Sequence, residues 1–462
     1  MSAVYRTSGI VAVAVVVLAA ITLGQQTSTS QPRADQLPPV GPARPNRGGN
    51  VPAPPGAMPS GPAGFTVSVY AELQGPRMMV YAPNGDLFVS SPSTNSITVL
   101  RDTNNDGTFE ARGLFAQGAV PAPRGGGGNP QGGARPAGPA PAPVAAAVNP
   151  EINGPILGAN APACAAPPSF NNPGPGTLAA PFGLAFHGGF LYVGTPGALI
   201  RYKYANGDLK AQGEPEKLLD FPTGGHSTRN VIFNRAGTKM YVAVGSSSNN
   251  NAGEDCRRAA ILEFNPDGSG YRIFASGIRN PVGLAWQPGT DTLWTAVNER
   301  DNLGDGLVPD YATSVRDGGF YGWPYSYIGQ HYDPRYQGAF PDLVKRAIVP
   351  DVLFPAHSAA LGITFYGGTQ FPQRYRNGAF VGLHGSWNRS MAAGYKVVFV
   401  PMNNGRPGPV EDFLTGFIVN DGSGGASIER WGRPVGVTVA PDGSLLASDD
   451  GSHRIWRIRA TR

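Results

Sequence analysis

The chain has 462 residues and a formal net charge of +5, and its 65 glycines and 46 prolines make up about a quarter of it. The modest charge contains no block of five or more basic residues, which excludes the concentrated basic stripe of a nucleic-acid-binding protein. No Cys-x-x-Cys-His motif occurs, which excludes a c-type haem.

The N-terminal residues 1–24 are typical of a secretory signal peptide. Arg6 supplies the positive start, and residues 10–23 form an apolar run that is short for a bilayer span. We therefore predict a secreted or periplasmic protein, with an uncleaved N-terminal anchor as the alternative. Residues 25–63 are rich in proline and lack aromatic side chains, so we predict a disordered spacer there and a folded domain over 64–462.

Within that domain one pattern recurs six times: an apolar run, a Gly-containing turn and a second apolar run. The turns lie at residues 83–86, 187–189, 235–238, 287–290, 376–378 and 441–443. Such units are hairpins, and without insertions their spacing is close to the roughly 40–50 residues of a four-stranded blade. The sequence predicts an all-β fold, a six-bladed β-propeller with four-stranded antiparallel blades. A Gly/Pro/Ala-rich insert at about 116–178 is predicted to be a surface excursion between two blades rather than a blade.

In a propeller the residues just before each innermost strand surround the mouth of the central channel. Reading that position across the repeats gives Arg77, Phe182, His226, Arg229, Asn230, Arg279, Asn280, His357, Ser358 and Arg433. Uncompensated cations there would repel one another, so we expect an anionic ligand such as a carboxylate or phosphate. The alternative is that each Arg pairs with a carboxylate inside the propeller.

His226 follows a flexible Gly pair and is expected to face the axis. Neighbouring Arg charges disfavour its protonated form, so a neutral His226 is a candidate general base. Four other histidines receive a structural interpretation, although one of them, His384, is also a candidate to line the site: His187, His331, His384 and His453.

Two oxygen-rich segments are candidate cation sites. Residues 298–305 are acidic and suit a hard cation such as Ca²⁺, with a solvated acidic loop as the alternative. Residues 102–107 resemble the start of a calcium loop, but Gly113 stands where an EF-hand would have Glu, and a hairpin turn is favoured. The two cysteines, Cys164 and Cys256, could form a disulfide, which their spacing leaves open.

These motifs together resemble the soluble quinoprotein sugar dehydrogenases of the glucose/sorbosone dehydrogenase family. The resemblance runs from about residue 64 to the C-terminus, except for the insert, and is carried by residues 225–230, 277–285, 298–301, 318–324, 355–359 and 384–389. It implies a six-bladed propeller that binds pyrroloquinoline quinone (PQQ) over the channel mouth, and a Ca²⁺ ion that polarises the quinone.

The resemblance also implies roles for individual residues. His226 is similar to the catalytic base, which takes a sugar hydroxyl proton while hydride passes to the quinone. The candidate cofactor contacts are Arg229, Arg279, Asn280, His357, Arg389, Arg433 and Asp449, with Asp450 as the alternative acid. Backbone carbonyls of Glu299, Arg300 and Asp301 correspond to the calcium turn, where the glucose enzymes have Gly and Pro.

The predicted function is oxidation of an aldose or a related, sorbosone-like sugar or aldehyde. Its partners would be a small sugar substrate and an external electron acceptor, a cytochrome or a quinone. A calcium-dependent lactonase-like hydrolase and a non-catalytic propeller that binds glycans or envelope partners are the alternatives, because a fold does not fix a function.

Overall fold

The computed structural model describes residues 31–104, 106–119 and 171–461. The predicted signal peptide, Cys164 and most of the insert lie outside the described residues, so export and the disulfide stay predictions. None of the helices found in the described ranges is long and apolar enough to cross a membrane.

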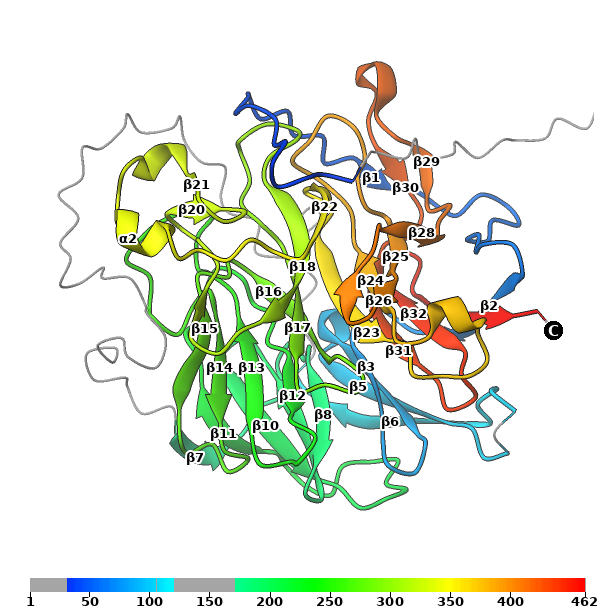
Figure 1. The fold of residues 1–462 in the computed structure, drawn as a ribbon. Helices are drawn as coiled ribbons and strands as arrows, with labels where there is room; N and C mark the ends of the chain where they lie inside the picture. Colours follow the sequence, from blue (N-terminus) through cyan, green and yellow to red (C-terminus); the bar gives the residue numbers. More distant parts are fainter. Residues whose placement is uncertain (1–30, 105, 120–170, 462) are drawn as a thin grey trace, which may run out of the picture.

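Six sheets of four or five strands follow one another along the chain (Figure 1). Sheet 1 comprises β3 (Met79–Tyr81), β4 (Leu87–Ser91), β5 (Ser96–Arg101) and β6 (Ala111–Gln117). Sheet 2 comprises β8 (Leu184–His187), β9 (Phe190–Gly194), β10 (Ala198–Lys203), β11 (Glu216–Asp220) and, at its edge, β7 (Asn171–Pro175). Sheet 3 comprises β12 (Val231–Phe233), β13 (Met240–Val244), β14 (Ala260–Phe264), β15 (Arg272–Ser276) and β19 (Gly319–Phe320).

The other three large sheets have four antiparallel strands each. Sheet 4 comprises β16 (Pro281–Trp286), β17 (Leu293–Val297), β18 (Pro309–Val315) and β22 (Val352–Ala356). Sheet 5 comprises β23 (Ala360–Phe365), β24 (Ala379–Leu383), β25 (Lys396–Val400) and β28 (Glu411–Leu414). Sheet 6 comprises β31 (Pro434–Val439), β32 (Leu445–Asp449), β33 (Arg454–Ala460) and β2 (Phe65–Glu72). The only parallel pair in the six sheets as described is β15 with β19.

Small elements decorate the loops. They are β1 (Gly49–Asn50), β20 (Ser326–Tyr327), β21 (His331–Tyr332), β26 (Met402–Asn403), β27 (Arg406–Pro407), β29 (Ile418–Asn420), β30 (Glu429–Arg430), the short helix α2 (Pro341–Val344) and single 3₁₀ turns at Pro92–Thr94, Pro334–Tyr336, Gln373–Tyr375 and Ser423–Gly425. Residues 298–350, the longest insertion between repeats in the described part, hold β18 to β21 and α2.

The repeat predicted from the sequence is confirmed. Each of the six turns joins the first two strands of one sheet, β3 to β4 in sheet 1 and β31 to β32 in sheet 6. The strands that leave these turns are buried over their whole length in sheets 1, 3, 4, 5 and 6, which explains their unbroken apolar runs.

Glycines let the first strands approach one another closely. A Cβ atom on Gly283 would lie 2.3 Å from the carbonyl oxygen of Leu361, and one on Gly436 would lie 2.4 Å from that of Arg77. Phe182, Val282, Leu361 and Val435 form a buried cluster where these strands meet. Glycine therefore recurs in this strand because any side chain would push neighbouring sheets apart.

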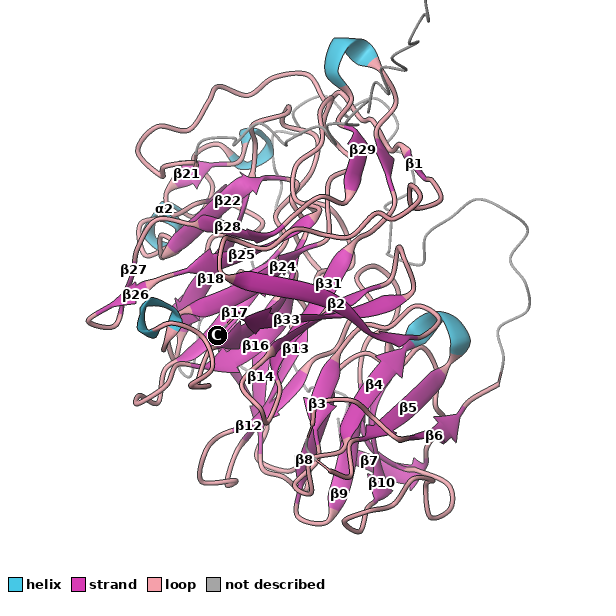
Figure 2. Cartoon of the chain, turned by 90° about the vertical axis from the view of Figure 1, so that its right-hand side faces the viewer, coloured by secondary structure: helices cyan, strands magenta, loops and turns pink. Residues whose placement is uncertain are grey.

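Hydrogen bonds link each sheet to the next at this level. They run from Ser90 to Phe182, Gly183 to Arg229, Ser246 to Arg279, Asn298 to Ala360, Arg433 to His384 and Ser448 to Arg77. Sheet 6 joins the two ends of the chain, because β2 pairs antiparallel with β33 from Phe65–Ala460 to Glu72–Arg454 (Figure 2).

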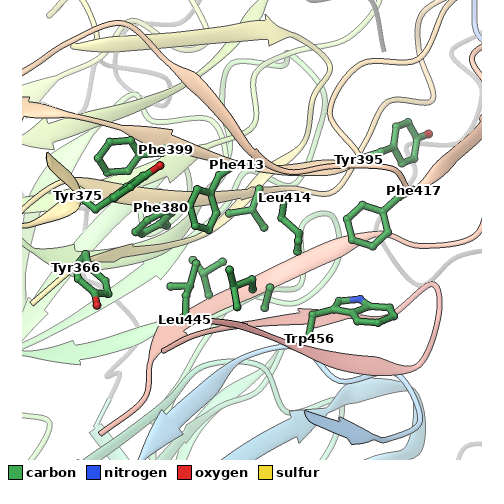
Figure 3. Packing of buried hydrophobic residues seen from close by; sticks show 14 of the residues in the cluster. Tyr366, Tyr375, Phe380, Tyr395, Phe399, Phe413, Leu414, Phe417, Leu445 and Trp456 are labelled. Carbon is green, nitrogen blue, oxygen red and sulfur yellow. The ribbon is translucent and has the colours of Figure 1, made fainter. Parts of the chain in front are cut away.

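Aromatic side chains fill the space between sheets 5 and 6 (Figure 3). The rings of Phe380 and Phe413 lie 4.6 Å apart at 60°, and those of Trp431 and Trp456 lie 5.8 Å apart at 84°. Such edge-on pairs each add roughly 0.5–1.5 kcal/mol beyond the burial of apolar area.

Two predictions about the boundaries of the domain are wrong. The predicted spacer 25–63 is ordered from residue 31: Gly49 and Val51 donate backbone bonds to Ile428 and Arg430, and Ser60 exchanges two with Thr415. The insert also contains β7, which pairs with β11 at the edge of sheet 2. An extended Pro-rich segment can bind through its backbone carbonyls and its remaining N–H groups, and this needs no regular spacing of apolar side chains. The sequence of residues 31–63 therefore did not reveal these backbone contacts.

Candidate active site

Most of the predicted axial residues directly precede the first strand of their sheet and are buried. Arg229 and Asn230 precede β12, Arg279 and Asn280 precede β16, and Arg433 precedes β31. Two groups of side chains form at this level, one built around Asp301 and the other around Asp450.

His226 lies beside the Asp301 group. Its Nδ1 is 2.9 Å from the carbonyl oxygen of Ser246. A carbonyl only accepts, so Nδ1 carries the hydrogen and Nε2 keeps its lone pair. Burial and then the charge of Arg279 lower the pKa of His226 to about 3, so the imidazole is neutral at neutral pH. Gly245 makes room here, because a Cβ on it would lie 2.2 Å from Asn280 Oδ1 and 2.7 Å from His226 Cβ.

Arg279 uses all three guanidinium nitrogens within the protein. Nε donates to the carbonyl oxygen of Asn249 at 2.9 Å, Nη1 to that of Glu299 at 2.7 Å, and Nη2 to Asn249 Oδ1 at 3.0 Å. Nη2 also lies 3.7 Å from the carboxylate of Asp301. This arginine is therefore compensated and occupied before any ligand binds.

Asp301 also holds His357. Its Oδ1 is 3.2 Å from His357 Nδ1, and His357 Nε2 donates to the carbonyl oxygen of Gly304 at 3.0 Å. Burial opposes the charged imidazole, but the hydrogen bond and the charge of Asp301 outweigh it and raise the pKa of His357. We call His226, Arg279, Asp301 and His357 the Asp301 group.

Asp450 organises the second group. Its carboxylate lies 2.5 Å from Arg77 Nη2 and 2.8 Å from His384 Nε2, and Arg433 Nε donates to the carbonyl oxygen of His384 at 3.2 Å. Burial, followed by the charge of Arg433, lowers the pKa of His384 to about 3. Arg77, His384, Arg433 and Asp450 are the Asp450 group.

The expected ring of uncompensated cations is therefore wrong for Arg77 and Arg279, which Asp450 and Asp301 compensate. Arg389 and Arg433 differ, because the described residues place no carboxylate within 4 Å of either. Arg389 Nη1 makes one long bond of 3.4 Å to the carbonyl oxygen of Ala356, and its buried Nε has no partner among the described residues. Burial lowers the pKa of Arg433 to about 10 and that of Arg389 as well.

Two predicted cofactor contacts, Arg229 and Asp449, make several hydrogen bonds within the protein. Arg229 is fully buried and donates to the carbonyl oxygens of Pro222, His226 and Thr228, so it holds the loop before β12. Asp449 accepts from the backbone of Arg433, Gly451 and Ser452 and from Trp456 Nε1, and burial raises its pKa. Its neighbour Asp450, the alternative acid, is the one that lies among the cations.

The turn predicted to hold calcium does not fit that ion in this arrangement. The carbonyl oxygen of Glu299 accepts from the Arg279 guanidinium, and that of Asp301 accepts from Arg300 Nε at 3.0 Å. Burial raises the pKa of the Glu299 carboxyl to about 7. Arg300 itself pairs with Asp333. A divalent cation would have to displace guanidinium groups from these oxygens.

An anionic, planar ligand fits the same region better. Asn280 Oδ1 and Arg389 Nε are buried without a hydrogen-bond partner in the described structure, and buried polar atoms rarely remain so. Asn280 Oδ1 can only accept a hydrogen bond, whereas the guanidinium groups of Arg389 and Arg433 can donate to carboxylate oxygens. PQQ, a planar tricarboxylate, is a ligand of this kind.

Three further contributors were missed by the sequence reasoning: Ser246, Asn249 and Asp333. Ser246 and Asn249 lie in the loop after β13, the second strand of its sheet, whereas the sequence comparison covered only the positions before the first strands. The only signal was the polar run over residues 246–251. Elsewhere, the hairpin turn favoured for residues 102–107 lies between β5 and β6. Carboxylate oxygens of Asp102, Asp106 and Glu110 lie within 4.8 Å of one another there.

Residues 216–386 match the family described as Glucose / Sorbosone dehydrogenase, and residues 342–461 match one described as TrAA12-like. Over residues 216–386 the chain is therefore similar to the glucose/sorbosone dehydrogenase family.

Individual relatives show the same similarity. The PQQ-dependent pyranose dehydrogenase of Coprinopsis cinerea is 28% identical over 294 residues, 51% of this chain and 39% of that protein. The aldose sugar dehydrogenase of Escherichia coli is 26% identical over 218 residues, 41% of this chain and 54% of that protein. The holo PQQ domain of the Coprinopsis enzyme has the same fold, with a TM-score of 0.62 at 21% identity, covering 89% of this chain and 98% of that one. The chain spans 39% to 60% of the length of the curated relatives that it matches.

Proposed function

We propose that the protein is a PQQ-dependent dehydrogenase that oxidises an aldose or a related sugar or aldehyde. One observation carries the proposal: the neutral imidazole of His226, with Nδ1 fixed by the Ser246 carbonyl, leaves Nε2 free as a base in a partly buried polar site. The family match and the fold of the solved relatives support it.

We infer that the six sheets close into a six-bladed propeller. The bonds that link each sheet to the next, and Ser448 of sheet 6 to Arg77 of sheet 1, support closure. Closure would bring the residues before all six first strands to one channel mouth, where a planar ligand could contact several of them together.

The chain's own residues would act as follows. His226 Nε2 accepts the proton of the hydroxyl group on the carbon that is oxidised, while the hydrogen on that carbon leaves as hydride. When bound, PQQ supplies the two-electron acceptor. Arg389 and Arg433 bind its carboxylates, and Asn280 orients its polar edge. A base works best when its pKa is near the working pH, so His226 gains strength once an anion offsets the charge of Arg279. An external cytochrome or quinone then takes the electrons.

Dye reduction by purified protein loaded with PQQ tests the proposal against a panel of sugars. We expect turnover with at least one aldose, and a loss of about 10²–10⁴-fold in kcat for His226→Ala with PQQ affinity kept. His187→Ala is the matched control, because His187 stacks on Phe233 at 4.3 Å, outside both groups. PQQ binding with unchanged turnover in His226→Ala would refute the role of His226. Absence of PQQ binding by the wild type would refute the dehydrogenase and leave the lactonase-like and glycan-binding alternatives.

A further inference from the structure

The Pro-rich segment before the first sheet lies across the loops that build the candidate site. We call residues 33–51 the N-terminal strap; it is the dark blue trace that runs over the upper end of the molecule in Figure 1. It contributes β1, which pairs in parallel with β30. Its contacts fall on two loops that are far apart in the sequence.

The first loop is residues 301–307. Gly41 N donates to the carbonyl oxygen of Leu303 at 2.9 Å, and Pro38 covers Gly306 so closely that a Cβ there would lie 2.7 Å from Pro38 Cγ. Ala34 and Leu37 pack against the apolar cluster that contains Leu303 and Leu307. This loop supplies Asp301 to the site, and its Gly304 carbonyl fixes the ring of His357.

The second loop is residues 386–390, which supplies Arg389. Asn46 Nδ2 donates to the carbonyl oxygens of Ser390 at 3.1 Å and Ala426 at 2.8 Å, and Asn46 Oδ1 accepts from Ile428 N at 3.2 Å. Three of the four hydrogen-bonding positions of the Asn46 side-chain amide therefore have partners outside the strap. Next to it, the guanidinium carbon of Arg47 lies 5.0 Å from the centroid of the Trp387 ring.

The two loops also touch each other, because Ser390 donates from both N and Oγ to the carboxylate of Asp305. The strap therefore holds, from outside, a pair of loops that carry Asp301 and Arg389 on their inner sides. Arg389 needs such support, since its own contact within the site is a single long bond to Ala356.

We propose that the strap is part of the active site and that Asn46 is a positioning residue for Arg389. The proposal rests on the proposed function, because Arg389 is taken to bind the anionic cofactor. Without the two donor bonds from Asn46, the loop 386–390 loses its connection to residue 426, and the Arg389 guanidinium is no longer held toward the ligand.

Asn46→Ala and Asn46→Asp test this in the full-length protein. Asn46→Asp keeps the acceptor toward Ile428 N but places an oxygen against the carbonyl oxygens of Ser390 and Ala426. It therefore tests the two donor bonds separately from the acceptor bond. Ser60→Ala is the control, because Ser60 lies in the same N-terminal segment and its side chain bonds only to its neighbour Gly61. The measurements are amide hydrogen exchange over residues 386–390 and fluorescence titration with PQQ.

We expect faster exchange in residues 386–390 in both Asn46 variants, PQQ affinity weakened about tenfold, and wild-type behaviour in Ser60→Ala. Unchanged exchange in the Asn46 variants would overturn the proposal. Faster exchange with full PQQ affinity would also overturn it, because the loop would then not position Arg389. If the wild type binds no PQQ, the proposed function fails, whereas exchange still reports whether Asn46 holds the loop.

Discussion

The buried His384 makes a quantitative prediction about stability and pH. Its ring is fully buried, it donates to Asp450, and its folded pKa is about 3 against about 6.5 in an unfolded chain. Between these values the unfolded state binds a proton that the folded state does not, so the free energy of unfolding falls as the pH falls below about 6.5. At pH 5 the loss relative to pH 8 is about 2 kcal/mol from this residue alone.

The variant His384→Gln keeps a donor toward Asp450 but cannot titrate. Guanidinium chloride unfolding, followed by tryptophan fluorescence at pH 8, 7, 6 and 5, gives the free energy of unfolding for both proteins. We expect the variant to be less stable at pH 8 and to lose about 2 kcal/mol less than the wild type on going to pH 5. The other titrating groups cancel in this difference. Parallel pH profiles would refute a neutral buried His384.

Three further predictions follow from the contacts. Arg229→Met should leave PQQ affinity within about twofold of wild type while lowering the unfolding midpoint, because it strands buried carbonyls at roughly 1 kcal/mol each; a large loss of PQQ affinity would restore Arg229 as a ligand contact. Adding the chelator EGTA should not change PQQ affinity in a fluorescence titration, since guanidinium groups occupy the carbonyls of the Glu299–Asp301 turn; weaker binding reversed by Ca²⁺ would show that the turn rearranges around calcium. Gly283→Ala should lower the thermal midpoint sharply or abolish soluble expression, because its Cβ would lie 2.3 Å from a backbone oxygen; a normal melting curve would mean that sheets 4 and 5 can separate freely.

The repeat was predictable because each sheet starts with the same local structure. A turn between two apolar runs and a glycine in the first strand are properties of short segments, and all six turns fell between the expected strands. The positions before these strands were found for the same reason, as with Arg279 and Arg433. The repeat in the sequence thus predicted which residues precede the first strand of each sheet.

The partners of those side chains were not predictable from the period. Asp301 and Asp450 both follow the second strand of their sheet, β17 and β32, whereas only the positions before the first strands were compared across the repeats. The sequence did not distinguish Asp449 from Asp450, because adjacent residues point to different surroundings: Asp449 accepts from backbone groups and Trp456, whereas Asp450 contacts Arg77 and His384. The strap was missed because its contacts depend on backbone groups, which leave little trace in composition.

The pairing of β2 with β33 has a consequence for how the molecule assembles. Roughly 380 residues separate the paired strands, yet loop-closure entropy grows only with the logarithm of length, so closing this loop costs only about 3 kcal/mol more than closing a 20-residue loop. The large separation instead slows folding, because segments so distant in the sequence come into contact late. Sheet 6 cannot form before the last strand has been synthesised, and until then β2 has an unpaired edge. Loss of a few residues from the C-terminus would therefore leave exposed strands at both ends of the chain, and aggregation rather than partial activity is the expected fate of a shortened protein.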